Sequence, residues 1–543
     1  MADWHWPFYL KIDGQILKDA MISNLEIRQE LGAHYWCDVE FRLINQQQPP
    51  VATYLGKTLE FIAFEEYATE FPVFNGLVLE AELAYELHGD YIARLRGVTE
   101  SYKLQLTPEE DYFYKKNLKE VAQQIISQDG LELQFNANGD SKRMNYVQWG
   151  ESDFDFLRRI ADDQGCFMRP TPKGVEIRQG FEDTGLTIRW NEEHGLISFS
   201  IKGWLGQPSF DGTCYDPRTM ESKRFNKVSK EPQFFPESAA DMVGAVMEQS
   251  KQLPPGRLVF DGRSPKIDNY QALLEKESQR SLGSKIIATG ISRSVRLMPG
   301  EKVRIEGTNF AAQGDYGLTY VVHHYDQTNG YRNEFIASPW MDYTAAEQPK
   351  PNLMFGVVSA RVVNHNDPRG MGRIQIKYDW MEDEMTSWAR MTMPSAGGGR
   401  GIMFMPEIGD EVLVAFEYGD PERPYIIGAL WNSVDSAPRQ GFWDTEGMQA
   451  VGSNGMQVAA DMARNDIKRI VTKSGNRIQL VDVGGKESIV ISTPGGQTIQ
   501  LIDSCPETGG RKMLCLNSPG DIFLNAPDGR VHIRSKFFSR ETG

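Results

Sequence analysis

Aliphatic residues recur in pairs at positions i and i+2 from about residue 466 onward, and turns such as KSGN, VGGK, TPGG and SPGD separate these pairs. Two side chains so spaced on a strand point to the same face. The pattern therefore predicts a series of very short strands with one apolar face. The residues expected on this face are Ile478, Leu480, Ile489, Ile491, Ile499, Leu501, Leu514, Leu516, Ile522 and Leu524.

One ribbon of such strands buries too little apolar surface to offset the entropy lost on ordering it. Its edge strands would also lack partners. Three copies wound around one axis would direct the pairs inward and would pair each edge with a neighbouring chain. The pattern therefore predicts an intertwined triple-stranded β-helix over residues 466–543. A monomeric sandwich of the same strands is the alternative.

Residues 353–433 contain a compact run of strand candidates that ends in EVLVAF, the turn YGDPERP and YIIGALW. Several short strands closely spaced are typical of a small OB-type barrel. The last two strands predict its closing hairpin, and the pairing is expected to pass from within the chain to between chains after Asn432. Residues 434–465 have no clear period and read as a linker. The residues expected to shape the hairpin are Gly409, Asp410, Gly419, Pro421 and Pro424.

The first 345 residues are also rich in short strand signals, so the fold class is mainly β with a few helices. Strands dominate residues 1–105 and 191–345, and residues 106–190 read as an α/β insertion. Two helices are expected in that insertion. Asn117 with Glu120, and Ser152 with Asp155, have the spacing of helix-capping pairs.

The net charge of −16 narrows the range of partners. Phosphate binding requires a basic surface, so nucleic acid is not expected as the main partner. No secretory signal opens the sequence, and no apolar run is long enough to span a membrane, so cytoplasmic synthesis without stable membrane insertion is expected. Five scattered cysteines fit reduced thiols.

No catalytic, metal or cofactor site is predicted, because the common hydrolase, metalloprotease and phosphate-loop motifs are absent from the sequence. His323 and His324 with Asp326 suggest a metal, but neighbours on a strand point to opposite faces. The OB segment mixes aromatic residues with cations, as nucleic-acid binders do, yet Asp379 and residues 382–384 crowd the same region with carboxylates. Its aromatic and basic residues include Arg369, Arg373, Lys377, Trp380, Trp388, Arg390 and Arg400.

Four stretches in this order resemble VgrG proteins, the trimeric hub and spike of type VI secretion and related contractile injection systems, and the fused hub and spike of contractile phage tails. The stretches are YVQWGESDFDFLRRIADDQGC, LMPGEKVRIEG with YRNEFIASP, GRIQIKYDW with the OB hairpin, and NDIKRIVTKSGNRIQLVDVGGKESIVISTPGG.

The resemblance implies that residues 1–105 and 191–345 form two tube-like hub barrels, so that three chains give a pseudo-sixfold ring matching a hexameric inner tube. It implies a structural homotrimer that caps this tube, anchors the baseplate proteins and pierces the target envelope, delivered outside or into a target cell. A PAAR-type tip protein and effector cargo are the further partners implied. Phe537 and Phe538 are expected near the tip, where they would dock the tip protein or close the trimer end.

Two other functions remain open at this point. A spike-borne cell-wall hydrolase or effector is one, although residues 434–465 are too few for an inserted enzyme domain and the sequence stops shortly after a further aliphatic pair, Val531 and Ile533. A carbohydrate-binding tail fibre is the other. The sequence does not distinguish a type VI system from an extracellular injection particle or a phage tail.

Overall fold

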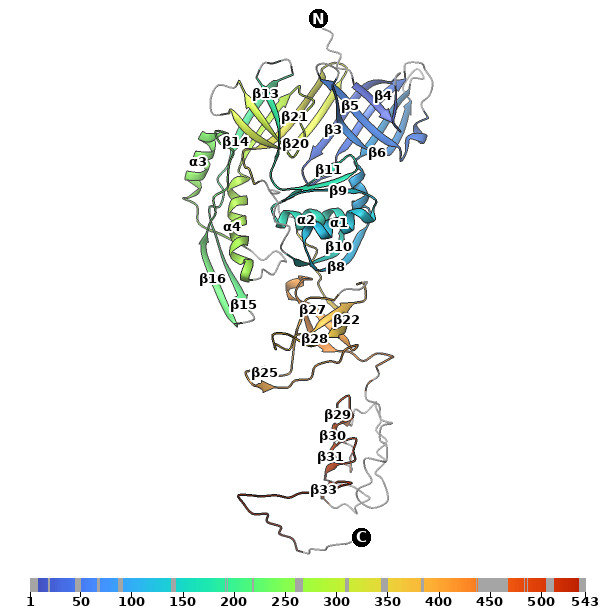
Figure 1. Cartoon of the computed structure of the whole chain (residues 1–543), viewed down its shortest axis with the longest axis vertical. Helices are drawn as coiled ribbons and strands as arrows, with labels where there is room; N and C mark the ends of the chain where they lie inside the picture. Colours follow the sequence, from blue (N-terminus) through green and yellow to red (C-terminus); the bar gives the residue numbers. More distant parts are fainter. Residues whose placement is uncertain are drawn as a thin grey trace. The chain divides into compact units, whose positions relative to one another are not determined.

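The computed structural model consists of two compact units, residues 1–429 and residues 430–543, and each is described by itself (Figure 1). The structure describes residues 8–17, 20–43, 50–65, 69–85, 91–137, 143–190, 192, 194–216, 219–258, 267–307, 312–342, 350–381, 385–435, 437, 467–482, 484–485, 487–503 and 512–536. The chain is mainly β with few helices, as the sequence predicts. Among the residues described here, none of the helices combines the length and the apolar character that a bilayer crossing requires.

The first unit begins with an antiparallel sheet that curves around an apolar core, in the order β3-β4-β7-β6-β5-β1-β2. Leu25, Ile27, Phe41, Phe61 and Leu59 lie fully buried inside it. The elements are β1 (Phe8–Ile12), β2 (Gln15–Ile16), β3 (Ala20–Glu30), β4 (Trp36–Leu43), the 3-10 helix η1 (Val51–Tyr54), β5 (Thr58–Glu65), β6 (Thr69–Tyr85) and β7 (Tyr91–Val98).

A second barrel-like sheet follows the order β14-β18-β21-β20, with β19 pairing both β20 and β13. A bridge between Trp190 and Leu196 connects the ends of β13 and β14. Because β13 pairs with β19, this sheet begins ahead of residue 191, where the sequence analysis placed its start. The strands are β13 (Glu182–Arg189), β14 (Leu196–Gly203), β18 (Ile286–Ser292), β19 (Glu301–Glu306), β20 (Gly314–Asp326) and β21 (Gly330–Ser338).

The two curved sheets are one continuous sheet, because β20 pairs with β3 from Tyr320 opposite Glu30 to Asp326 opposite Asn24. β20 thus carries β19 and β3 on different parts of its length and β21 along its other edge. Backbone hydrogen bonds therefore join segments about three hundred residues apart in the sequence, and they fix the two barrels to each other.

An α/β module connects the two barrels in the chain. Helices α1 and α2 lie between the two-stranded β8–β10 sheet and the sheet of β9, β11 and β12 (Figure 1). The predicted caps are confirmed, since Asn117 and Glu120 form a capping box and the Ser152 side chain accepts from the Asp155 N–H. The elements are η3 (Glu100–Gln105), β8 (Pro108–Lys116), α1 (Leu118–Gln128), β9 (Glu132–Asn136), β10 (Met144–Ser152), α2 (Asp153–Asp163), β11 (Phe167–Thr171) and β12 (Gly174–Arg178).

A long excursion from the second barrel, between β14 and β18, forms a hairpin that packs against α4 (Figure 1). Phe210, Phe225, Tyr270 and Leu274 make its small core. Its elements are β15 (Phe210–Asp216), β16 (Glu221–Val228), α3 (Ala240–Ser250), β17 (Gly256–Arg257) and α4 (Ile267–Gly283).

The first unit ends in a five-stranded sheet of order β23-β22-β27-β28-β24, whose core includes Ile374, Ile376, Val412, Val414 and Ile426. This is the segment expected to form an OB barrel, and β27 and β28 form its closing hairpin. The elements are β22 (Val357–Asn364), β23 (Gln375–Tyr378), β24 (Arg390–Met391), β25 (Ala396–Gly397), β26 (Arg400–Gly401), β27 (Glu411–Phe416), η4 (Glu417–Gly419) and β28 (Pro424–Ala429).

The second unit contains an antiparallel meander in which each strand pairs with the next. The strands are β29 (Ile467–Val471), β30 (Arg477–Val481), β31 (Ser488–Ser492), β32 (Thr498–Ile502) and β33 (Met513–Asn517). In the single chain these strands pair with one another, and pairing between chains after Asn432 stays a prediction. Tight turns such as Thr472 to Asn476 let consecutive strands fold back on each other, so the ladder forms within one chain.

Candidate assembly surface

The predicted aliphatic pairs form two continuous rows across the second-unit ladder. Ile478 lies opposite Ile491, and Leu480 lies opposite Ile489. The pairing of β31 with β32 and of β32 with β33 extends both rows without a register shift. We call this surface the aliphatic face, and it consists of Ile478, Ile491, Ile499 and Leu516 in one row and Leu480, Ile489, Leu501 and Leu514 in the other.

The aliphatic face is exposed in the single chain. The exposed fractions of Ile489 and Leu501 are 39% and 46%, and that of Leu514 reaches 66%. The alternate positions of the same strands are the buried ones, with Val481 at 2% and Val490 at 5%. Soluble monomers rarely expose a contiguous apolar patch of this kind, and such patches mark association surfaces.

One member of the first row was missed from the sequence. Ile470 on β29 lies opposite Ile478 and is 43% exposed, so it continues the row by one strand. Ile467 and Ile470 lack the i and i+2 spacing used to find the pairs. The turn KSGN could have identified Ile470 in the sequence, because a hairpin with this turn places Ile470 opposite Ile478. Lys468 begins the other row and pairs with Asp482 across 2.6 Å.

The last predicted pair differs from the others. Ile522 and Leu524 are exposed, at 54% and 65%, as the other pairs are. They lie outside any strand, however, so they do not belong to the ladder of the single chain. No neighbouring strand of the described chain follows β33 to pair with them. Phe537 and Phe538, and most of the linker 434–465, lie outside the described residues.

The residues predicted to shape the OB hairpin lie at its two turns. Gly409 has a φ of +101° in the turn before β27, where Asp410 Oδ2 accepts from the Glu407 N–H across 2.8 Å. Gly419 has a φ of +83°, and a Cβ there would lie 3.2 Å from Phe355 Cε1. Pro421 and Pro424 are buried at the second turn and at the start of β28.

The OB sheet is joined to the β8–β10 sheet of the α/β module by a shared core. Tyr112 and Val147 lie buried in the same cluster as Ile376 and Val412. Gln375 Nε2 lies 3.4 Å from the Tyr114 hydroxyl. Because the OB sheet and the α/β module share this buried core, we expect them to move as one rigid body.

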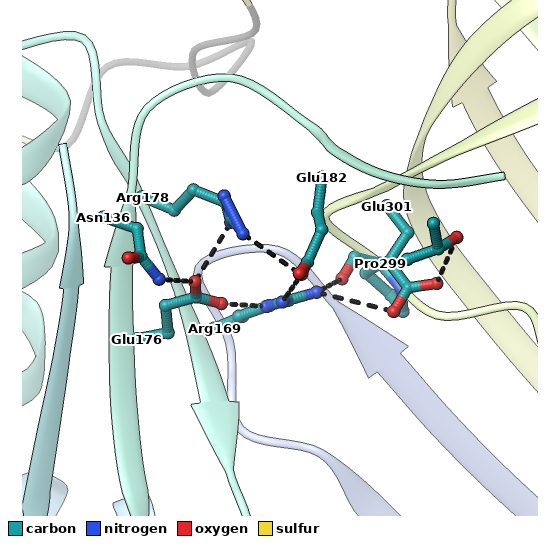
Figure 2. A network of polar contacts seen from close by, with 8 residues as sticks. Asn136, Arg169, Glu176, Arg178, Glu182, Pro299 and Glu301 are labelled. Atoms are coloured by element: carbon teal, nitrogen blue, oxygen red, sulfur yellow. Dashed lines mark hydrogen bonds and ion pairs between the residues drawn. The ribbon is translucent and has the colours of Figure 1, made fainter. Parts of the chain in front are cut away.

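Buried charges connect β11, β12, β13 and β19 within the first unit (Figure 2). Arg169 pairs with Glu176, whose side chain is 2% exposed, and its Nη2 lies 2.5 Å from Glu182 Oε2. Arg178 Nε and Asn136 Nδ2 donate to Glu176 Oε1 across 3.0 and 2.6 Å. A planar guanidinium can bridge two carboxylates in this way and hold three strands in register.

Glu301 adds a third carboxylate to these two guanidinium groups. Its Oε1 lies 4.0 Å from Arg169 Nη1, and Thr184 Oγ1 lies 3.5 Å from its other oxygen. Burial raises the pKa of Glu301 to about 7, against the lowering effect of Arg169, and the charge of Glu182 raises it further. The network therefore changes its charge near neutral pH.

His323 and His324 point to opposite sides of β20. His323 is fully buried between Tyr331, 2.5 Å from Nδ1, and Gln29, 3.2 Å from Nε2. His324 Nδ1 lies 3.5 Å from Glu26 Oε2 on the outer side. Burial lowers the pKa of His323 to about 3. Because its two nitrogens already have partners, His323 belongs to a polar cluster at the seam between β3 and β20.

Within the described ranges, no three His, Cys, Asp or Glu side chains are grouped as a metal site would require. Cys37, Cys166, Cys214 and Cys515 are buried and take part in no disulfide within the described ranges. Burial raises the pKa of Cys166 to about 11 and raises that of Cys37 as well, so these two are held as thiols.

Two family models match parts of the chain. The phage tail baseplate hub family matches residues 35–174, and the type VI secretion system and phage-baseplate injector OB domain matches residues 358–431. The first range covers much of the first barrel and the α/β module, and the second covers the OB sheet.

Individual proteins agree with these matches. The type VI secretion system spike protein VgrG4b of Pseudomonas aeruginosa is 24% identical over 72% of this chain and 52% of its own length. The actin cross-linking toxin VgrG1 of Vibrio cholerae is 24% identical over 62% of this chain and 33% of its own length. The chain thus spans about half the length of the first relative and a third of the second.

A solved structure shows the same fold over nearly the whole chain. The half-lidded Francisella PdpA-VgrG complex contains a chain that superposes with a TM-score of 0.59 at 10% identity, covering 94% of this chain and 88% of that one. At this identity the likeness concerns the fold alone.

Proposed function

We propose that this chain, a VgrG-type spike protein, assembles as a homotrimeric hub and spike at the tip of a contractile injection machine. Its role is mechanical: the hub caps the inner tube and anchors the baseplate, and the second unit forms the needle that pierces the target envelope. No residue is assigned a chemical step. The observation that carries the proposal is the exposed aliphatic face.

Packing three aliphatic faces around one axis would bury the apolar surface that the single chain leaves exposed. Each half-exposed Ile or Leu side chain contributes on the order of 1 kcal/mol when its remaining surface is buried. The face repeats on four strands, so the contribution from three chains is large compared with the stability of a typical domain. The ladder within each chain then stiffens the needle, because bending it breaks backbone hydrogen bonds in all three chains.

The proposal also places the partners. A hexameric tube protein would contact the first unit. Each chain has two barrels joined at the β3–β20 seam, so three chains would present six barrels to it. A PAAR-type protein would bind the far end of the needle, and effector cargo would travel with the assembly. The protein would be made in the cytoplasm and delivered outside or into a target cell.

The deciding experiment is the molar mass of the full chain in solution by light scattering. A homotrimer gives about three times the chain mass of 61.4 kDa. A monomer at micromolar concentration would overturn the proposal, and a stable dimer would do the same, because two faces cannot close around a threefold axis.

A further inference from the structure

The first unit has a pocket of about 600 Å³ where the β8–β10 sheet, the end of β15 and the OB sheet meet. This volume lies within the range of about 300 to 1,000 Å³ that is common for ligand sites. Lys115 on β8 and Asn145 on β10 line it from one side, and Asp216 lines it from β15. The OB sheet contributes Arg369, Met371, Arg373, Trp388, Arg390, Arg423 and Tyr425, among others.

The cations of this pocket fall into two groups. Arg373 Nη2 lies 2.6 Å from the buried carboxylate of Asp367, and Arg423 Nη1 lies 3.1 Å from Glu417 Oε2. Lys115, Arg369 and Arg390, by contrast, are exposed and form no ion pair with a carboxylate anywhere in the described ranges. The pocket therefore carries three unpaired positive charges in a chain whose net charge is −16.

Aromatic rings support these cations. The Arg390 guanidinium lies 5.6 Å from the centre of the Tyr425 ring, and the Lys115 ammonium lies 4.8 Å from that of Tyr114. Arg373 is similarly placed over Trp388, at 5.7 Å. Such stacking fixes long flexible side chains without neutralising them. The pocket thus offers oriented charges beside flat apolar surfaces.

The backbone at Lys115 is held in an unfavourable conformation. Its φ is +51°, in the left-handed region that non-glycine residues seldom adopt. The Asn145 side chain holds it there, because Oδ1 accepts from the Lys115 N–H across 2.9 Å. Strained residues held by neighbouring side chains are frequent at functional sites.

We propose that this pocket binds an acidic peptide segment of a partner protein. Carboxylates of the segment would pair with Lys115, Arg369 and Arg390, while its apolar side chains would contact Met371 and the aromatic rings. The segment's charge would be repelled by most of the acidic protein surface and attracted here, which gives selectivity for the site. This inference goes beyond the structural role proposed above and does not depend on the number of chains.

Nucleic acid is the less suitable occupant, although cations and aromatic rings are mixed here as the sequence pattern suggested. Asp216, Glu417 and Glu422 also line the pocket. A polyphosphate backbone would pass close to these carboxylates at every residue, whereas a peptide can place single carboxylates beside the three unpaired cations.

The test is fluorescence anisotropy of the full chain with a labelled hexapeptide of alternating glutamate and leucine at low ionic strength. The double variant Arg369→Gln/Arg390→Gln should bind about tenfold more weakly or worse, the loss expected for removing charge-assisted hydrogen bonds. Arg361→Gln is the matched control, since Arg361 is an exposed arginine of the same OB sheet that does not line the pocket. It should bind as the wild type does.

A second measurement on the unaltered chain does not depend on any variant folding. Carbodiimide coupling should join a peptide carboxylate to the amine of Lys115, the one lysine among the pocket-lining residues, and mass spectrometry would locate the bond. Undetectable peptide binding, equal binding by the double variant, or equal binding of a lysine and leucine hexapeptide would each overturn the proposal. Tighter binding of a short oligothymidylate that depends on the same arginines would assign the pocket to nucleic acid instead. The solution mass of the double variant should be that of the wild type, which separates this result from a failure of the trimer.

Discussion

The backbone N–H of Ser387 donates a hydrogen bond to the Tyr112 hydroxyl oxygen across 2.7 Å, and this bond connects the OB sheet to the β8–β10 sheet. The Tyr112 ring is 4% exposed and packs in the OB core itself. In the spike proposed above, force on the α/β module would pass to the OB sheet through this contact. A side chain from one part buried in the core of the other resists sliding better than surface contacts would.

Replacing Tyr112 by Phe should lower the free energy of unfolding by about 1–3 kcal/mol, because the Ser387 N–H loses its partner in a buried place. Chemical denaturation of the full chain measures this. Tyr85→Phe, at a tyrosine that is 66% exposed, should change stability by far less. Equal effects of the two substitutions would show that the Tyr112 hydroxyl does not stabilise the joint.

The stability of the first unit should depend on Glu301 in a pH range set by its shifted pKa. The pKa of Glu301 in the folded chain, about 7, lies above the ordinary value of 4.5. Its contribution to the free energy of unfolding is therefore fully present below pH 4.5 and is lost as pH rises through 7. Glu301→Gln should therefore gain stability relative to the wild type as pH increases from about 4.5 to 7. Thermal unfolding at several pH values measures the difference.

Glu182 provides a control of opposite sign in the same network. Burial alone would raise the pKa of Glu182, but Arg169 and Arg178 hold it below its ordinary value. The stabilisation by Glu182 is therefore present at neutral pH and is lost on acidification. Glu182→Gln should lower the free energy of unfolding at pH 7 and change it little in acid. Parallel pH profiles for the two variants would contradict the assigned charge states.

Local features of this fold were predictable from the sequence, and distant pairings were not. The capping box of Asn117 and Glu120 depends only on neighbours three residues apart. The aliphatic face follows from a period of two within short strands and from turns that return the chain at once. The strand-period argument also placed His323 and His324 on opposite sides of β20, and the structure has them so.

The seam between β3 and β20 has no such signal, because nothing near Val321 specifies that Gln29 lies opposite it. The network of Arg169 and Glu301 is equally hidden, since its members come from strands that meet only in the folded chain. The same limit applies to the strands between residues 467 and 517, whose pairing within one chain was not predicted. Short strands looked unable to pair alone, whereas the turns suffice to form the ladder within one chain.

A charge on the aliphatic face should prevent assembly. Ile489→Asp would place a carboxylate where three chains are proposed to pack, and burying an unpaired charge costs several kcal/mol or more. Light scattering should show the variant shifted from the trimer mass toward that of a single chain. Ser474→Asp, at an exposed turn of the same ladder, adds the same charge and should leave the mass unchanged. An unshifted Ile489→Asp trimer would place the interface elsewhere.

The seam between the barrels should be acid-sensitive because of His323. Gln29 Nε2 donates to the Val73 carbonyl across 2.8 Å, so Gln29 Oε1 faces His323 and accepts a hydrogen bond from its Nε2–H, while the Tyr331 hydroxyl donates to Nδ1. This arrangement suits the neutral imidazole. Burial, with the neighbouring charge of His324, lowers its pKa from 6.5 to about 3.

His323 therefore stabilises the fold fully above pH 6.5, and this stabilisation is lost as pH falls toward 3. The reason is that the imidazole binds a proton near pH 6.5 in the unfolded chain but stays neutral in the folded chain. His323→Leu should cost about 2–4 kcal/mol at pH 8, since it leaves the buried Gln29 side-chain oxygen without its donor and removes one hydrogen bond of the Tyr331 hydroxyl. The difference from the wild type should shrink steadily below pH 6.5. Denaturant unfolding of both proteins from pH 8 to pH 4 measures it, and a difference that stays constant or grows in acid would mean that His323 is charged in the folded protein.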